Sequence, residues 1–427
     1  MNLYTLSGNA LAQALRNEQE TYTALAATGI RLDLSRGRPA PEQLDAGMPM
    51  LADRAYLAPD GTDCRNYGQP LGIPEMRALF EEIVGVPKEN IVVGGNSSLQ
   101  MIFDAFLRAM VFGTVHSPRP WYEETGRKFL CPVPGYDRHF RITERLGFAM
   151  PTVPMTEAGP DMDAVERLAL DPAVKGIWCV PRYANPTGVT YSEETVRRLA
   201  TMKTGAPDFT VVWDDAYAVH GLTATPAPLA NLFLLAREAG TADRVWVFTS
   251  TSKITFAGGG VAMMGASDAY WAKNLPYITA QIIGTDKLGQ LRHLHFLRDR
   301  AGVEAQMQRH RAILAPKFDS LLRTLERELG GTGIARWTTP KGGYFISLDL
   351  PSGCARRTHA LARGAGLTLT EAGATYPYGV DPQDSNLRLA PSCCPTEEVP
   401  LAGRILASSA RLAFLESRAG TRHALKN

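Results

Sequence analysis

The sequence predicts an α/β protein with a mostly parallel, seven-stranded-type sheet flanked by helices, followed by a smaller α+β unit. Short unbroken apolar runs, which are typical of buried strands, alternate with amphipathic helical stretches at spacings of about 30 to 40 residues. Such alternation implies right-handed crossovers between parallel strands. After about residue 290 the pattern changes to one long charged and apolar helix and then to a few short strands. These observations indicate a large unit and a smaller one.

The chain of 427 residues has room for roughly two to three domain-sized units. We expect an N-terminal segment, residues 1–50, to pack with the small unit. The large unit is expected over 51–310 and the small C-terminal unit over 311–427.

The first elements follow from apolar spacing. Leucines and a tyrosine recur at helical intervals in 9–28, and the Pro- and Gly-rich segment 36–49 should be irregular. Apolar residues at helical spacing fill 98–111, directly after a short apolar run and a glycine pair. In this first part of the chain we expect a helix at 9–28, a strand at 91–93, a helix at 98–111, a strand at 129–133 and a helix at 140–146.

The later elements continue the alternation until the small unit begins. The expected strands are 176–180, 209–213 and 244–248, with helices at 193–202 and 229–239 between them. For the small unit we expect a helix over 295–329, strands at 343–348 and 386–389, and a closing helix at 401–415.

Composition excludes several classes of function. Lys and Arg total 45 against 43 for Asp and Glu, so no basic field attracts nucleic acid or an anionic membrane. The N-terminus lacks a signal-peptide pattern and no apolar run is long enough to span a bilayer, so we expect a cytoplasmic protein. The six cysteines show no CxxC spacing and the eight histidines no metal signature. Reduced thiols and no metal are therefore expected.

The segment TSTSKITFAGGG, residues 249–260, is the first candidate for a site. It follows a buried strand with a cluster of hydroxyls, one lysine and a glycine-rich turn. Lys253 at the end of such a strand is placed to lose its proton and act as a nucleophilic amine, as a Schiff base requires. A lone lysine in a polar loop is more often a solvated side chain. The residues at the ends of the other strands therefore decide between these two interpretations of Lys253.

Three further strands end in polar or special residues, at the edge where open parallel sheets bind ligands. The glycine–serine run 94–98 opens a helix and suits a phosphate, although a plain N-cap also explains its serines. NPTG, residues 185–188, reads on its own as an ordinary turn. Asp214 and Asp215 end a buried strand, where a carboxylate is costly unless it meets a cation, with an exposed loop pair as the alternative.

Together these strand ends match the needs of pyridoxal 5′-phosphate. The cofactor needs a phosphate cradle, a carboxylate facing its ring, a hydroxyl donor and a lysine that condenses with its aldehyde. A carboxylate near the ring nitrogen favours the charged pyridinium, which withdraws electrons from the substrate.

The chain at this point resembles the fold-type I, pyridoxal-phosphate-dependent aminotransferases over roughly residues 30–415. The resemblance implies that Lys253 carries the cofactor and is the catalytic residue. It also implies the other cofactor contacts: Ser97, Ser98 and Ser250 at the phosphate, Tyr136 stacked on the ring, Asn185 and Tyr217 at the ring oxygen, and Asp214 at the ring nitrogen. It leaves Asp215 without a role.

The resemblance extends to the partner subunit and the substrate. Tyr67, in YGQPLG, is similar to the tyrosine that reaches the phosphate of the neighbouring subunit's cofactor, which implies a homodimer. Arg388 matches the arginine that holds the substrate α-carboxylate through a planar fork, although a surface arginine on a strand is the alternative. Gly37 resembles the glycine that lets substrate approach, and Asn185 also faces substrate.

One position departs from the family pattern. Many members carry an arginine eight residues after the lysine, where this chain has Val261, so another group must neutralise the phosphate. The segments SKITFAGGGVA and LSRGRPAPEQLD resemble the MocR-type subgroup, which includes aspartate aminotransferases. Because only 66 residues precede Tyr67 and the charge is neutral, we expect no DNA-binding domain of the kind that MocR regulators carry.

The sequence therefore predicts a homodimeric aminotransferase that moves an amino group from an L-amino acid to a 2-oxo acid such as 2-oxoglutarate. An aspartate-like donor is favoured, and Arg36 or Arg38 are candidates for its distal carboxylate. A β-lyase or another fold-type I enzyme, and a non-catalytic cofactor-sensing regulator module, are the alternatives.

Overall fold

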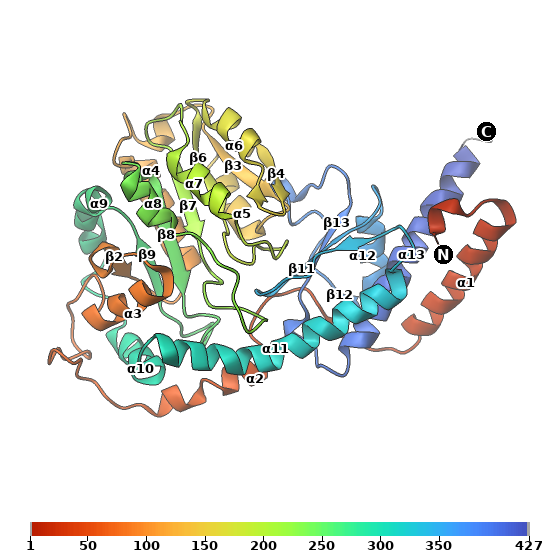
Figure 1. Ribbon diagram of the computed structural model, residues 1–427, viewed down its shortest axis with the longest axis horizontal. Coiled ribbons are helices and arrows are strands. Elements are labelled where there is room, and N and C mark those ends of the chain that lie inside the picture. The colour runs from red at the N-terminus through yellow and green to blue at the C-terminus, as the bar shows by residue number, and fades with distance from the viewer. Residues whose placement is uncertain (1, 425–427) are drawn as a thin grey trace.

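The computed structural model describes residues 2–424 and divides them visibly into a larger and a smaller lobe (Figure 1). The larger lobe is built around the main sheet. The long helix α11 (Arg300–Leu329) runs along the lower edge of both lobes, and α1 (Gly8–Ala26) lies beside α13 (Val399–Ala424) at the far end of the smaller one. The described part of the chain begins and ends at that end of the molecule.

The main sheet has eight strands in the order β2-β9-β8-β7-β6-β3-β4-β5. Strands β8, β7, β6, β3 and β4 pair in parallel, whereas β2, β9 and β5 join through antiparallel pairs. The strands are β2 (Ile91–Val93), β3 (Lys128–Val133), β4 (Thr152–Thr156), β5 (Gly159–Pro160), β6 (Val174–Cys179), β7 (Thr210–Asp214), β8 (Val245–Ser250) and β9 (Ala262–Gly265). The mostly parallel α/β sheet predicted from the sequence is confirmed, with eight strands rather than seven.

Helices cover both faces of this sheet because its strands are apolar on both sides. In β7, Val211 and Trp213 belong to one buried cluster and Val212 to another, as expected when successive side chains point to opposite faces. The surrounding helices are α3 (Pro74–Val84), α4 (Ser98–Phe112), α5 (Asp137–Arg145), α6 (Met162–Ala169), α7 (Glu193–Thr201), α8 (Leu232–Glu238), α9 (Asp268–Gln281) and α10 (Lys287–Leu297).

The smaller lobe combines the C-terminal part of the chain with the N-terminal segment. Its antiparallel sheet has the order β10-β11-β13, and β1 pairs in parallel with β12. Leu3, Leu25 and Leu34 belong to the same buried cluster as residues of α11 and α13. The elements of this lobe, besides α1, α11 and α13, are β1 (Leu32–Asp33), α2 (Pro41–Asp45), β10 (Arg336–Trp337), β11 (Ile346–Asp349), α12 (Ala355–Gly364), β12 (Leu367–Thr368) and β13 (Asn386–Leu389).

The predicted helix over 295–329 is wrong at its start, because two helices occupy this region. Helix α10 ends at Leu297, and Arg298 takes a positive φ of 62°. Asp299 then caps α11, its Oδ1 accepting a hydrogen bond of 2.8 Å from the Gly302 N–H. The first turn of a helix has free backbone N–H groups, which a continuous helix would not have at this point, and an N-cap satisfies them. Helix α10 therefore ends here and α11 begins as a separate helix.

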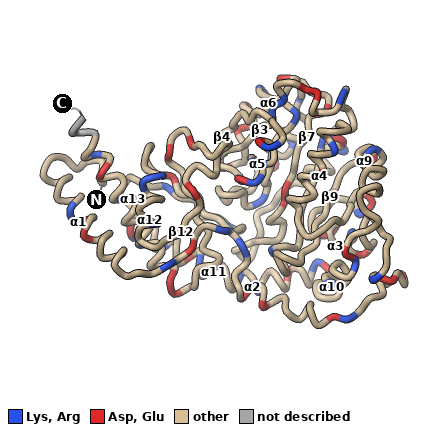
Figure 2. The backbone as a smooth tube through the Cα atoms, turned by 180° about the vertical axis from the view of Figure 1, so that it is seen from behind, with Lys and Arg blue, Asp and Glu red and all other residues tan. Residues whose placement is uncertain are grey.

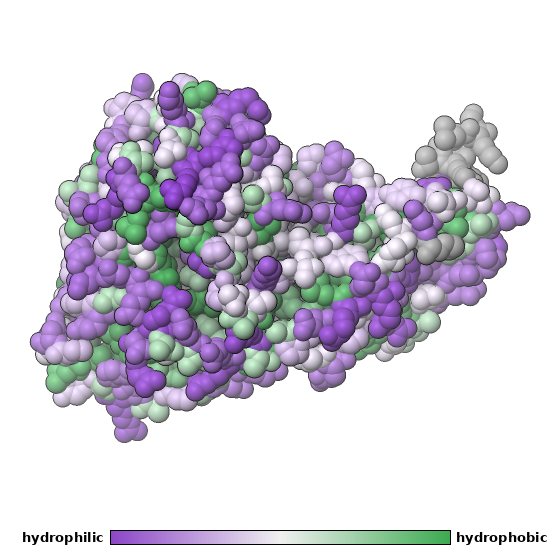
Figure 3. All heavy atoms as spheres, viewed as in Figure 1, coloured by the Kyte–Doolittle hydropathy of each residue, from purple (hydrophilic) through white to green (hydrophobic). Residues whose placement is uncertain are grey.

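No helix among the described residues is both long and apolar enough to cross a membrane. Lys and Arg are interspersed with Asp and Glu over both lobes (Figure 2). The face drawn in Figure 3 carries both polar and apolar residues. It is indented where the two lobes meet.

Candidate active site

A cavity of about 580 Å³ lies where the polar ends of β7 and β8 face the smaller lobe. It is lined from both lobes, including the N-terminal ends of α4 and α5, strand β13 and the segment before α2. Most of the predicted site residues line it, namely Gly37, Ser98, Tyr136, Asn185, Asp214, Tyr217, Lys253 and Arg388. Tyr67, Ser97 and Ser250 do not belong to its lining.

Lys253 lies in the turn that follows β8, half-buried, with its Nζ 5.0 Å from the centre of the Tyr217 ring. Burial lowers the pKa of this ammonium, and the negative charge of Asp214 opposes that shift. A lysine with a lowered pKa has a larger neutral fraction, which is the nucleophilic form. The alternative of a solvated loop lysine does not fit this environment.

Asp214 is the last residue of β7 and keeps one carboxylate oxygen without a partner. Its Oδ2 lies 2.9 Å from Nε2 of His139, while its buried Oδ1 has no hydrogen bond in the described structure. The His139 ring is stacked on Trp178, with centroids 4.3 Å apart and an angle of 7° between the planes. An unpaired buried carboxylate oxygen is costly, so this site calls for a donor from a bound molecule.

The second acid, Asp215, has a different environment although it is also buried. It is not part of the cavity lining. Burial raises the pKa of Asp215 to about 6, with Arg182 opposing and Asp214 adding to the shift. The alternative of an exposed acidic pair is therefore wrong for both residues, which are 3% and 5% exposed.

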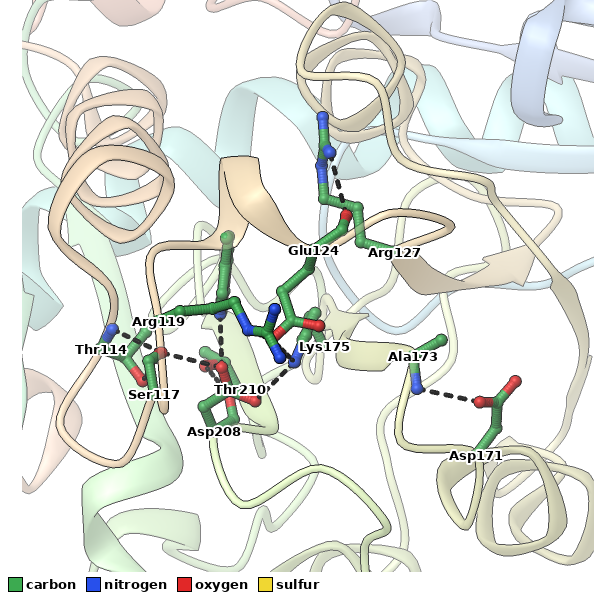
Figure 4. Close-up of polar contacts among 11 residues, drawn as sticks. Thr114, Ser117, Arg119, Glu124, Arg127, Asp171, Ala173, Lys175, Asp208 and Thr210 are labelled. Carbon is green, nitrogen blue, oxygen red and sulfur yellow. Dashed lines mark hydrogen bonds and ion pairs between the residues drawn. The ribbon is translucent and has the colours of Figure 1, made fainter.

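At the opposite end of the sheet lies a buried acid whose two carboxylate oxygens both have hydrogen-bond partners (Figure 4). Asp208, just before β7, accepts hydrogen bonds from Lys175 at 3.0 Å, Trp121 at 2.8 Å and Ser117 at 2.8 Å. This cluster leaves its carboxylate fully engaged and holds the amino ends of β6 and β7 together. Asp214, at the carboxyl end of β7, differs from Asp208 in keeping one buried carboxylate oxygen without a partner.

Hydroxyl groups connect β8 with the loop before α4. Ser250 Oγ donates to Ser252 Oγ at 3.0 Å, and Ser252 Oγ donates to the Asn96 carbonyl oxygen at 2.8 Å. Ser97 caps α4 by accepting a bond of 3.4 Å from the Gln100 N–H, as the plain N-cap alternative anticipates. Ser98 opens α4 and lines the cavity, where free N–H groups and the helix dipole favour an anion.

Val261 lies buried in the same region. Its backbone N–H donates to Thr251 Oγ1 at 2.8 Å, so this position supplies a structural bond and no positive charge. His293 contacts the turn that follows β8: its Nε2 lies 2.9 Å from Thr251 Oγ1 and 2.8 Å from Thr255 Oγ1.

Arg388 on β13 projects into the cavity and is 8% exposed. Its NH1 donates to Asp137 Oδ1 at 2.9 Å and to Asn185 Oδ1 at 3.2 Å, and its NH2 donates to Thr370 at 3.3 Å. Its guanidinium also lies 4.9 Å from the centre of the Phe345 ring. A guanidinium held in this way presents a fixed fork to a carboxylate, which the surface-arginine alternative does not explain.

The glycine at 37 is required by packing. A Cβ on Gly37 would come within 2.3 Å of the Phe345 ring, which itself supports Arg388. Burial raises the pKa of both Tyr136 and Tyr217, so these phenols are neutral hydrogen-bond donors and acceptors.

Sequence reasoning missed a buried polar network beneath Lys253. Gln43 Nε2 lies 3.0 Å from His310 Nδ1 and donates to the Tyr344 hydroxyl at 2.9 Å. Burial lowers the pKa of His310 to about 4 and that of the neighbouring His220 to about 3, so both stay neutral. Asp137 and His139 were missed as well. They follow directly after Tyr136, at the start of an amphipathic helix, which was the available signal.

The residues present fit pyridoxal 5′-phosphate. The unpaired Asp214 Oδ1 needs a donor, the start of α4 and Ser98 suit a phosphate, and Lys253 supplies the amine. In the described part of the chain, no group of three or more His, Cys, Asp or Glu residues is arranged to hold a metal ion.

Comparison with known proteins agrees with this geometry. A family model described as aspartate amino-transferase matches residues 6–422. An aspartate aminotransferase of Corynebacterium glutamicum is 47% identical over 402 residues, which are 92% of each chain. The crystal structure of an aspartate transaminase from the same species superposes with a TM-score of 0.95 at 44% identity, covering 98% of this chain and 99% of that one.

A more distant structure shows the same fold. The α-aminoadipate aminotransferase LysN of Thermus thermophilus, complexed with N-(5′-phosphopyridoxyl)-L-leucine, superposes with a TM-score of 0.72 at 24% identity, covering 91% and 93% of the two chains. The fold-type I architecture expected from the sequence is confirmed. The chain belongs to the aspartate amino-transferase family and is an aminotransferase that uses pyridoxal 5′-phosphate.

Proposed function

We propose that this enzyme moves an amino group from an aspartate-like L-amino acid to a 2-oxo acid such as 2-oxoglutarate. The observation that carries the proposal is the shared cavity of Lys253, Asp214 and Arg388. The aspartate aminotransferase relative supports the choice of donor. The domain boundaries at 50 and 310, the MocR-type subgroup and a cytoplasmic location remain predictions from the sequence alone.

The cofactor, when bound, supplies the aldehyde that takes up the amino group and the ring that accepts electrons from the substrate. Lys253 would hold the cofactor through its amine and would move a proton at the substrate Cα as base and acid. The neutral fraction that burial gives Lys253 supports both tasks.

In this proposal the other cavity residues hold the cofactor and orient the substrate. Asp214, fixed by His139, offers its free Oδ1 to a protonated ring nitrogen. Arg388 would orient the substrate carboxylate, and Asn185, whose Oδ1 accepts a hydrogen bond from Arg388, would hold the cofactor ring. With Val261 uncharged, we propose that the phosphate depends on Ser98, Ser250 and the N–H groups of α4.

The donor and the reaction are tested by a half-reaction screen. Holoenzyme is mixed with each common amino acid and the loss of the cofactor's visible absorbance is followed. Aspartate or glutamate is expected to give the fastest loss, and 2-oxoglutarate should restore the band. Release of pyruvate or ammonia without a restored band would instead support the β-lyase alternative.

We also propose that the enzyme is a homodimer in which Tyr67 reaches the partner's site. Tyr67 is 80% exposed in the single chain, and Lys287 fixes its segment by donating to the carbonyls of Asn66 and Gly68 at 2.7 and 3.0 Å. An exposed apolar stripe of α4, formed by Phe103, Leu107 and Val111, offers a surface for a second copy.

Leu107→Glu is expected to weaken the dimer at least about 100-fold, because burying an unpaired charge costs several kcal/mol. The variant should also lose cofactor, since Tyr67 would no longer reach the partner's phosphate. Analytical ultracentrifugation measures the effect. Leu170→Glu, at another exposed leucine outside the stripe, is the control and should remain dimeric. A dimer of unchanged affinity in Leu107→Glu would exclude this interface.

A further inference from the structure

A buried histidine lies between two segments that border the cavity. His310, on α11, is fully buried, and both of its ring nitrogens face glutamine side chains. Its Nδ1 lies 3.0 Å from Nε2 of Gln43, and its Nε2 lies 3.0 Å from Nε2 of Gln306. His310 is outside the cavity lining, so it acts on the site through these neighbours and not by touching a bound molecule.

The Nε2 side of His310 faces the lysine turn, residues 251–255, which carries Lys253. Gln306 lies four residues before His310 on α11, so the two side chains are neighbours on one face of the helix. Gln306 donates from its Nε2 to the Ile254 carbonyl oxygen at 3.2 Å. The backbone directly after Lys253 is therefore attached to α11 through the amide that His310 fixes.

The Nδ1 side of His310 faces the N-terminal segment, whose residues 35–38 line the cavity. Gln43, on α2 of this segment, accepts a hydrogen bond of 3.0 Å at its Oε1 from the Ala40 N–H. Its Nε2 donates to the Tyr344 hydroxyl at 2.9 Å. Gln43 is thus fixed at both ends of its amide, and His310 connects it to α11.

The imidazole makes these contacts without placing a charge beneath Lys253. Burial lowers the pKa of His310 to about 4, and hydrogen bonds with the backbones of Gln43 and Lys253 oppose that shift. The other titratable groups that face this network are His220 and Tyr344. Burial lowers the pKa of His220 to about 3 and raises that of Tyr344, so both are neutral as well. An acid here would raise the pKa of the lysine and a cation would lower it, whereas a neutral imidazole does neither.

We propose that His310 is a positioning residue that holds the lysine turn through its Nε2 and the N-terminal segment through its Nδ1. This inference rests on the proposed role of Lys253 and goes beyond it, because it names the buried group that sets the place of the amine in the cavity. The two contacts act on different steps. A misplaced Lys253 slows proton movement and so lowers kcat, whereas a displaced segment at 35–38 weakens substrate binding and so raises KM.

Two amide substitutions separate the two contacts of His310. An asparagine side chain ends near the position of Nδ1 and a glutamine side chain near that of Nε2. His310→Gln is expected to raise KM about 3- to 10-fold, the factor for one lost hydrogen bond, and to keep kcat within about 2-fold. His310→Asn is expected to lower kcat about 10- to 100-fold and to keep KM within about 2-fold. Steady-state rates of the holoenzymes measure both constants.

Hydrogen exchange of the holoenzymes gives a readout that does not depend on turnover. The amide N–H groups of residues 254–255 are bonded within the lysine turn at 2.8 and 2.9 Å, and those of 43–44 within α2 at 3.0 and 3.2 Å. His310→Asn should speed exchange at 254–255 about 3- to 10-fold and leave 43–44 unchanged. His310→Gln should show the reverse pattern. Peptide mass spectrometry after deuterium labelling measures both segments in one experiment.

His359 supplies the control for replacing a buried histidine. It lies on α12, outside the cavity lining, and its Asn and Gln variants should keep kcat, KM and the exchange of both segments. Equal losses in the two His310 variants, or wild-type behaviour in both, would overturn the proposal. If Lys253→Ala kept the cofactor absorbance, the role of Lys253 would be wrong, while the exchange pattern would still decide whether His310 holds the two segments.

Discussion

Replacement of Lys253 by alanine is expected to abolish amino transfer, with a fall in kcat of at least about 10⁴-fold. In the proposed mechanism, the variant loses both the amine that holds the cofactor and the group that moves the substrate proton. The position tolerates a smaller side chain, because Lys253 faces the cavity and is half-buried. Steady-state rates and the visible absorbance of the purified protein measure the two losses separately.

Lys88→Ala serves as the control for this experiment. Lys88 is an exposed lysine on a short 3₁₀ turn outside the cavity, so its removal should change neither rate nor absorbance. An unchanged visible spectrum in Lys253→Ala would refute the assignment of the cofactor-bearing lysine.

The second large effect is expected at the adjacent acids of β7. Asp214→Asn should lower kcat about 100- to 1,000-fold, because an amide no longer stabilises a positive charge on the ring nitrogen. Asp215→Asn should have less than about a 10-fold effect on kcat, since Asp215 is outside the cavity lining. Pre-steady-state rates of the half-reaction distinguish these variants, and a larger loss in Asp215→Asn would reverse the assignment.

Asp215→Asn also provides a test of the electrostatics. The folded-state pKa of Asp215 is about 6, above the value of about 3.9 in an unfolded chain. A raised carboxyl pKa means that ionisation destabilises the folded state as pH rises from about 4 to about 6. The stability of Asp215→Asn relative to wild type should therefore increase over that window, as measured by urea unfolding. A pH-independent difference would contradict the raised pKa.

The parallel sheet and its reactive edge could be predicted because buried strands carry a strong local signal. The strands at 91–93 and 386–389 were predicted with the bounds that the structure shows. The polar strand ends then identified Asp214 and Lys253, since parallel strands bring their carboxyl ends to one edge. The structure brings these two residues into one cavity, and the roles of all the predicted site residues stay predictions.

Contacts between distant segments could not be predicted, because no local pattern encodes them. The bond from Arg388 to Asp137 joins residues 251 positions apart. The network of Gln43, His310 and Tyr344 joins three elements far apart in the chain. The antiparallel strand β9 was also missed, because its short run after a glycine-rich turn resembles a loop.

We propose that Lys253 forms the covalent bond to the cofactor, within reach of Asp214. Borohydride reduction of the holoenzyme, followed by peptide mass spectrometry, tests it most directly. We expect one phosphopyridoxyl group on the peptide that contains Lys253, and none when Lys253 is replaced by alanine. A label on another lysine, or a holoenzyme without any label, would contradict this account.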